Sequence, residues 1–427
     1  MIKNDLPPIR ELIKSWRSCD ELFFLKKYFD ESHGLGSTKL PTPASTSFAK
    51  RKSSIFQRIA GRFIAIFNFF LLLVRCGVAP KGRILVFNHS TRIRQAGEKK
   101  RPLYLSENFD LSQIIIFEDS KNSLNYKNPG LRLNSIHVDR IAALITTLLS
   151  RLYQVQTGTT DPFIINFAVK RALWRFIFLI LSPKSINLIV WYGKEAIISA
   201  AKSLDICVSD IQHGIIYRSH PFYNLEKSKN IPHSDALLPD FCYVYGQYWR
   251  DLLLQSGWSP SQVKVIGYFL DIGPACPVPI DSPYILYTTQ PHTSQIIKQH
   301  IQSILPECHR RRWKIAIAPH PNEAKGLYQD ILEDDVILTG NDSYDLLREC
   351  VVHISVSSTL LWEAMAFKKP SYILQFGMEA QDLLIDLVKF GFGRPLENGE
   401  FPSPYSLPMT PSRNIFFEDT VDSSVFV

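Results

Sequence analysis

The sequence has no pair of cysteines at the spacing that binds zinc or forms a redox centre. Its seven cysteines are scattered singly along 427 residues. An odd number of single cysteines in apolar surroundings is typical of reduced thiols in a cytosolic protein. The first residues, Met1–Pro8, lack the apolar run that a signal peptide contains. We therefore expect a cytoplasmic protein.

Motifs that bind phosphorylated cofactors or metals are also missing. No G-x-x-x-x-G-K-[ST] segment is present, which argues against a P-loop nucleotide hydrolase. No G-x-G-x-x-G follows an expected strand, which argues against a dinucleotide enzyme. The D-x-D motif with which GT-A transferases bind a metal and a diphosphate does not occur either. We expect a protein with no cofactor and no metal.

The composition is that of a globular protein with a basic surface. Hydrophobic residues make up 45% and charged residues 21% of the chain, which excludes large-scale disorder. The net charge of +8 predicts an anionic partner. Because no zinc-finger spacing or RNP-like aromatic motif is present, we expect that partner not to be nucleic acid.

The most apolar segment runs from Arg58 to Ala79. Its core, Phe63–Val74, is interrupted by Asn68 and is shorter than the ~20 residues that span a bilayer. Basic residues precede the core, as in a helix that lies on an anionic surface. Two interpretations stay open: a buried helix packed on a sheet, or a helix in peripheral contact with a membrane.

Short apolar runs alternate with helix-like segments, which is typical of parallel α/β sheets. The regular alternation over 285–390 predicts one sheet, with helices at 323–331 and 359–367 among others. Earlier strands, starting at Arg83–Phe87, predict a second. The expected parts are a helical segment and flexible linker over 1–54, an N-terminal domain over 55–275, a C-terminal domain over 284–394, and a Pro-rich tail over 395–427 that lies extended on a surface.

Three motifs carry a resemblance to a known superfamily. They are Gln212-His213-Gly214, Pro319-His320-Pro321, and the run from Ser357 through Thr359 to Glu363-Ala364. Together they resemble the GT-B bacterial surface-polysaccharide glycosyltransferases, which include capsule Kdo transferases, polysialyltransferases and CDP-glycerol glycerophosphotransferases. The resemblance implies an α/β fold with two Rossmann-like domains facing across a cleft. It also implies that the C-terminal domain binds the nucleotide donor and the N-terminal domain the acceptor.

The expected donor site lies at strand ends of the C-terminal domain. Hydroxyls and free backbone N–H groups at the start of a helix suit phosphate, although a plain helix cap would explain the same run. His320, held between two prolines, resembles a donor-phosphate contact, and Glu363 resembles the acidic residue that many GT-B enzymes place on the donor ribose. The expected donor-binding residues are His320, Asn322, Ser355, Ser357, Ser358, Thr359 and Glu363.

The expected acceptor side lies in the N-terminal domain. An inverting transfer needs one base opposite the leaving nucleotide, and histidine titrates near neutral pH. His213 is the first candidate for this base, with Asp119 and Asp210 as rivals. The expected acceptor-binding residues are His89, Arg92, Arg94, Gln212, Gly214 and Arg218.

The sequence therefore predicts a metal-independent inverting glycosyltransferase of bacterial capsule or lipopolysaccharide synthesis. The expected partners are a nucleotide-sugar donor, CMP- or CDP-linked in preference to UDP-linked, and a glycan or lipid-linked acceptor. Contact with the cytoplasmic face of the inner membrane stays open. Two alternatives remain: a non-hydrolysing UDP-sugar 2-epimerase, and a catalytically silent scaffold of a polysaccharide assembly complex.

Overall fold

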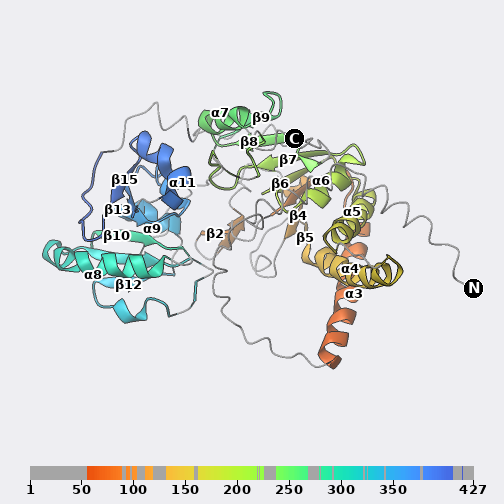
Figure 1. Cartoon of the computed structure of the whole chain (residues 1–427), viewed down its shortest axis with the longest axis horizontal. Coiled ribbons are helices and arrows are strands. Elements are labelled where there is room, and N and C mark those ends of the chain that lie inside the picture. Colours follow the sequence, from red (N-terminus) through yellow and green to blue (C-terminus); the bar gives the residue numbers. More distant parts are fainter. Residues whose placement is uncertain are drawn as a thin grey trace, which may run out of the picture.

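The computed structural model contains two parallel sheets, each in its own lobe (Figure 1). The residues described are 55–88, 93–96, 99–102, 111–118, 131–157, 162–218, 220, 222–225, 237–267, 278, 280–290, 293–320, 323–324, 326–340, 343–375, 378–406 and 416. The predicted α/β fold with two Rossmann-like domains is confirmed.

The N-terminal lobe is built on seven parallel strands in the order β5-β4-β1-β6-β7-β8-β9. They are β1 (Ile84–Phe87), β4 (Ile114–Glu118), β5 (Leu131–Asn134), β6 (Ser185–Ile189), β7 (Cys207–Ile211), β8 (Phe241–Val244) and β9 (Val263–Val265). The helices are α3 (Ile55–Val78), α4 (Ile136–Thr157), α5 (Pro162–Leu181), α6 (Glu195–Lys202) and α7 (Gln247–Gln255), with a 3-10 turn η1 (Leu111–Gln113) before β4. A separate antiparallel hairpin joins β2 (Ile93–Ala96) to β3 (Lys99–Pro102).

Alternating side chains of β1 pack on the two faces of this sheet. Leu85 and Phe87 lie in one hydrophobic cluster, and Ile84 and Val86 lie in another. Phe87 stacks on Phe117 of β4 with ring centroids 4.8 Å apart. Trp174 of α5 meets the Phe87 ring edge-on at 5.1 Å. This packing fixes α5 on the sheet and aligns the strand ends that carry the candidate site.

The C-terminal lobe is built on six parallel strands in the order β12-β11-β10-β13-β14-β15. They are β10 (Tyr284–Thr288), β11 (Lys314–Ala318), β12 (Val336–Leu338), β13 (Val352–Ser355), β14 (Ser371–Leu374) and β15 (Gly393–Leu396). The helices are α8 (Ser294–Arg311), α9 (Ser343–Glu349), α10 (Leu360–Glu363) and α11 (Met378–Lys389). The strand order reverses direction between β10 and β13, where ligands of open α/β sheets bind.

Two predicted helices of this lobe are wrong in extent. The segment 323–331 forms only a 3-10 turn, η5 (Gln329–Ile331), because Gly326 adopts a φ of 84°, which interrupts a right-handed helix. The segment 359–367 is helical only over α10. Beyond it the backbone continues in i→i+3 bonds, such as Phe367 N–H to the Ala364 carbonyl at 3.1 Å, which is the tighter 3-10 pattern.

The last strand, β15, was not predicted. Pro395 argued against a strand here, because proline has no backbone N–H to donate. However, β15 is an edge strand, where a missing N–H is tolerated. Gly393 begins it because a Cβ there would lie 2.9 Å from Leu387 Cδ2 of α11. The strand crosses the predicted end of the C-terminal domain at 394.

One residue of the predicted tail belongs to the core. Phe416 is fully buried, and its carbonyl accepts a hydrogen bond from Trp249 Nε1 of α7 at 2.8 Å. Its ring lies 5.3 Å from that of Trp362 of α10. At this residue the tail therefore does not lie extended on a surface. It closes a hydrophobic cluster shared by both lobes.

Helix α3 is largely exposed. Phe63, Phe67 and Phe70 are 69%, 60% and 61% exposed, whereas Leu72 and Cys76 are buried on the side facing the sheet. The buried-helix interpretation therefore holds for one side only. The stretch Ala60–Val78 is long and apolar enough to cross a membrane, which corrects our expectation that it is too short.

Candidate active site

Polar residues gather at the carboxyl ends of three adjacent strands of the C-terminal sheet. Thr289 follows β10, His320 follows β11, and Ser357–Thr359 follow β13. Since β10 pairs in parallel with both β11 and β13, these ends share one edge. The predicted donor residues His320 and Ser357–Thr359 therefore come from strands on either side of β10, at the switch point of the sheet.

The backbone of His320 is held by side chains from two loops. Its N–H lies 3.0 Å from Thr289 Oγ1 and 2.9 Å from Glu323 Oε2. Thr289 also donates to Glu323 Oε2, and Tyr328 donates to Glu323 Oε1 at 3.1 Å. The Glu323 carboxylate thus joins the loops after β10 and β11. It fixes the backbone position of His320, whose side chain is half-buried.

Sequence reasoning missed Glu323 and Thr289. A signal was present, because Glu323 stands three residues after His320, the spacing of a capping box. The Glu323 N–H also bonds to the His320 carbonyl at 2.9 Å, which closes the turn in both directions.

The serine cluster after β13 divides into buried and accessible hydroxyls. Ser355 is fully buried, and its hydroxyl donates to the Thr288 carbonyl of β10 at 2.5 Å. Ser358 is buried as well, and its Oγ accepts the Leu360 N–H at 3.2 Å, as a cap does. Ser357 and Thr359 are only half-buried. Donor contacts from hydroxyls of this cluster are therefore best placed on Ser357 and Thr359.

Glu363 lies inside the C-terminal domain. It is 3% exposed, and its Oε2 accepts a hydrogen bond from Tyr344 of α9 at 2.9 Å. The bond ties α10 to α9 beneath the serine cluster. Its expected contact with a donor ribose stays a prediction.

In the N-terminal lobe, His213 follows β7 and lies beside Tyr192, which follows β6. The Tyr192 hydroxyl is 3.5 Å from His213 Nε2. Tyr192 stacks on Phe222 with ring centroids 4.5 Å apart, which fixes the phenol. The chain turns sharply before Tyr192, because Val190 adopts a φ of 72°, strained for a β-branched residue. The half-buried imidazole thus has a positioned hydroxyl partner.

His220 is the second imidazole in this cluster. Its ring lies 5.6 Å from Tyr192 and 4.9 Å from Tyr223. Burial lowers the pKa of His220 to about 4, so it is neutral at physiological pH and a weak base. His220 is therefore a poor candidate for the base.

Asp210 is buried near the end of β7, three residues before His213. It accepts a hydrogen bond from the Tyr223 hydroxyl at 2.6 Å, and its Oδ1 has no hydrogen-bond partner. Burial raises the pKa of Asp210 to about 7, and the Tyr223 hydrogen bond only partly offsets that rise. With 1% exposure the carboxylate does not reach an acceptor hydroxyl directly. This burial argues against Asp210 as the base.

Gln212 holds the His213 loop in place. Its Nε2 donates to the Gly214 carbonyl at 2.8 Å, and its Oε1 accepts the Tyr245 N–H at 2.9 Å. Gln212 is 2% exposed, and Gly214 is also buried. We expected both residues at the acceptor. Because the amide is committed at both ends, the structure gives Gln212 a supporting role behind the loop.

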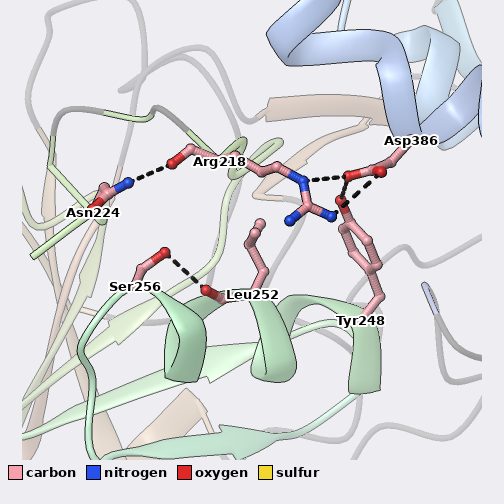
Figure 2. A network of polar contacts seen from close by, with 6 residues as sticks. All are labelled: Arg218, Asn224, Tyr248, Leu252, Ser256 and Asp386. Carbon is pink, nitrogen blue, oxygen red and sulfur yellow. Dashed lines mark hydrogen bonds and ion pairs between the residues drawn. The ribbon is translucent and has the colours of Figure 1, made fainter. Parts of the chain in front are cut away.

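Arg218, expected at the acceptor, reaches the other lobe. Figure 2 shows its guanidinium on Asp386 of α11, with Nε 3.2 Å from Oδ2, and Tyr248 of α7 on the same carboxylate. The Arg218 carbonyl accepts from Asn224 Nδ2 at 2.7 Å, which fixes its loop. The loop that follows His213 is thereby tied to the C-terminal domain.

Several predicted site residues lie outside the described part of the chain. They are Asp119, Asn322, His89 and Arg92. Arg94 lies on β2, but its side chain is not among those described. Within the described ranges, no group of three or more His, Cys, Asp or Glu side chains could hold a metal.

Solved structures resemble this chain, although no family model matches it and no curated protein matches its sequence. A structure from Listeria monocytogenes, described as a UDP-N-acetylglucosamine 2-epimerase, has a TM-score of 0.50 at 13% identity and covers 74% of this chain and 84% of its own. The fold is GT-B.

Two further GT-B structures are similar at lower scores. The UDP-GlcNAc 2-epimerase from Neisseria meningitidis has a TM-score of 0.48 at 15% identity, over 74% of this chain and 87% of its own. The calicheamicin glycosyltransferase CalG4 has a TM-score of 0.45 at 12% identity, over 74% of this chain and 86% of its own.

Proposed function

We propose that this protein is a metal-independent inverting glycosyltransferase. It would transfer a sugar from a nucleotide donor, CMP- or CDP-linked in preference to UDP-linked, to a glycan or lipid-linked acceptor in capsule or lipopolysaccharide synthesis. The observation that carries the proposal is the shared edge of β10, β11 and β13, at the switch point, where the carboxyl ends of β11 and β13 lead into His320 and into Ser357 and Thr359. Phosphate-binding side chains at that edge suit a nucleotide diphosphate or monophosphate.

In the proposed reaction, the acceptor hydroxyl loses its proton to the His213 imidazole and its oxygen forms a bond to the anomeric carbon. The bond from that carbon to the donor phosphate oxygen breaks, and the electron pair leaves with the nucleotide. His320 and the half-buried hydroxyls stabilise the charge that develops on the phosphate. Attack opposite the leaving group inverts the anomeric configuration.

The partner of His213 supports its role as the base. Tyr192, 3.5 Å from Nε2, orients the ring. Asp210, three residues before His213, accepts a buried hydrogen bond of 2.6 Å from the Tyr223 hydroxyl. The proposal places the enzyme in the cytoplasm, in keeping with the free thiols of Cys76, Cys207, Cys242, Cys308 and Cys350.

A 2-epimerase is the second candidate, because the solved structure from Listeria monocytogenes with the same fold is described as one. The two activities differ in their need for an acceptor. An epimerase converts UDP-GlcNAc alone, whereas a transferase needs an acceptor hydroxyl and releases free nucleotide.

The deciding experiment follows the full-length protein by proton and phosphorus NMR with CMP-, CDP- and UDP-linked sugars. Each donor is offered alone and with a lipid and glycan extract. We expect nucleotide release only when an acceptor is present, together with a product of inverted anomeric configuration. Conversion of UDP-GlcNAc to a 2-epimer without acceptor would reject the transferase and establish the epimerase.

Two variants complete this assay. His213→Ala should abolish transfer, and His309→Ala, at an exposed histidine of α8, should leave it intact. Full transfer by His213→Ala would refute the assignment of the base.

A further inference from the structure

Exposed large apolar side chains are concentrated on three helices of the N-terminal lobe. Among the described residues, those on these helices are Phe63, Ile64, Ile66, Phe67, Phe70, Leu71, Val74 and Val78 of α3, Leu148 and Leu152 of α4, and Phe176 and Leu179 of α5. The described remainder of the chain adds only Leu338 and Ile385. Apolar patches of this size mark a surface that binds another partner.

The three helices lie together. Helices α3, α4 and α5 contact one another, and Figure 1 shows them on the outer side of the N-terminal lobe, away from the C-terminal lobe. The stripe on α3 from Phe63 to Val78 is about 22 Å long at the rise of an α-helix. The neighbouring exposed pairs on α4 and α5 stand four and three residues apart, on one side of each helix.

The charge of the same helices identifies the partner. They carry eight basic residues, Arg58, Arg62, Arg75, Arg140, Arg151, Lys170, Arg171 and Arg175, and one acidic residue, Asp139. Lys170 pairs with that carboxylate at 2.7 Å. The whole chain has 48 basic and 40 acidic residues, so the excess here is local. Arg62, Arg151 and Arg175 are exposed on the same helices as the exposed aromatic and aliphatic side chains, which suits the headgroup region of an anionic bilayer.

The packing of α3 decides how it would meet that bilayer. Leu72 and Cys76 lie in the cluster that includes Leu85 and Phe117 of the sheet. A helix anchored to the sheet along one side is not surrounded by lipid. Its free side can only lie along the surface.

We propose that α3, α4 and α5 form a docking face, with α3 lying in the plane of an anionic lipid bilayer. This proposal does not rest on the proposed transferase activity. It places the GT-B domains at a membrane surface, where a lipid-linked acceptor would be within reach.

Flotation of the full-length protein with vesicles tests the docking face. Wild type should float with mixed phosphatidylcholine–phosphatidylglycerol vesicles and much less with phosphatidylcholine alone. Phe67→Ser combined with Phe70→Ser should lower the bound fraction at least about tenfold. Arg62→Glu combined with Arg175→Glu should lower it by a similar factor, and high salt should weaken wild-type binding.

Leu338→Ser is the matched control, because it removes an exposed apolar side chain from the C-terminal lobe. It should bind vesicles as wild type does. Since Phe67 and Phe70 are exposed, their variant should unfold at the wild-type temperature, which separates lost docking from lost folding.

Four results would each overturn the proposal. In the first, wild type fails to float with the anionic vesicles. In the second, Leu338→Ser loses as much binding as the docking-face variants do. Another is a wild-type dimer that Phe67→Ser with Phe70→Ser converts to a monomer, which would assign the face to a second copy. In the last, alkaline carbonate fails to release the bound protein from the vesicles, which would make α3 a membrane-spanning helix.

Discussion

Arg218 Nε lies 3.2 Å from Asp386 Oδ2, and this ion pair joins the loop after His213 to helix α11 of the other lobe. Asp386 is 8% exposed at its side chain, whereas Arg218 is 52% exposed. Tyr248 donates a hydrogen bond to the same carboxylate. The position of the candidate base is thereby coupled to the domain that carries the expected donor site.

A double-mutant cycle measures this coupling. Arg218→Ala and Asp386→Ala should each destabilise the protein, and the double variant should lose less than their sum by about 0.5–1 kcal/mol, because the pair is partly screened by solvent. The coupling should shrink in high salt. Tyr248→Phe, which leaves both charges in place, is the control. Strictly additive losses would show that the pair does not couple the lobes.

Phe416 should be a main determinant of the contact between the lobes. Its ring packs against Trp249 and Trp362 within a fully buried cluster. Phe416→Ala should lower the free energy of unfolding by about 3–5 kcal/mol, as loss of a buried aromatic ring does. Phe401→Ala, at a half-buried ring, should cost less. Denaturant unfolding measures both, and equal losses would argue against a special role of the tail residue.

The pH dependence of stability should contain a contribution from Asp210. Burial raises its pKa from 3.8 to about 7 in the folded protein. The folded state therefore keeps a proton that the unfolded chain has released, and stability falls as the pH rises through this range and levels off above it. His220 has the opposite effect on stability. Its pKa is lowered from 6.5 to about 4 in the folded protein, so the unfolded chain takes up the proton first and stability falls as the pH drops through this range.

Comparison of wild type with Asp210→Asn separates the contribution of Asp210 from that of His220. Between about pH 5 and pH 8, wild type should lose on the order of 3 kcal/mol relative to Asp210→Asn, which cannot ionise. Urea unfolding at both pH values measures this difference, with Asp251→Asn, at an exposed carboxylate of α7, as the matched control. Parallel pH profiles for wild type and Asp210→Asn would mean that the carboxylate is already charged in the folded state.

The sequence predicted the strands of the C-terminal sheet up to β14 because each is a short, mainly apolar run followed by small or polar residues. It missed β15, where Pro395 argued against a strand and only the edge position permits one. The prediction also made α10 too long. The segment after Glu363 forms i→i+3 hydrogen bonds, which no local sequence pattern predicts. For the candidate site, the sequence pattern was enough to place His213 and His320 at the carboxyl ends of strands, which the structure confirms; their roles stay predictions.

Contacts between residues far apart in the sequence could not be predicted from local sequence patterns. Nothing near Arg218 indicates Asp386, 168 residues later, and nothing near Trp249 indicates Phe416. The contact of Glu323 with His320 could have been predicted, because the two residues stand three apart, at the spacing of a capping box. Burial separated Ser355 and Ser358 from Ser357 and Thr359, a distinction that depends on the folded environment of each side chain and not on residue type.

The most direct test of the account is nucleotide binding at the edge of β10, β11 and β13. Thermal unfolding of wild type, His320→Ala and the control His309→Ala is measured with CMP, CDP, UDP and GDP. At about 100-fold over its dissociation constant, the cognate nucleotide should add about 2.7 kcal/mol of stability. We expect this gain in wild type and His309→Ala and its loss in His320→Ala. No gain with any of the four nucleotides, or an undiminished gain in His320→Ala, would contradict the donor site.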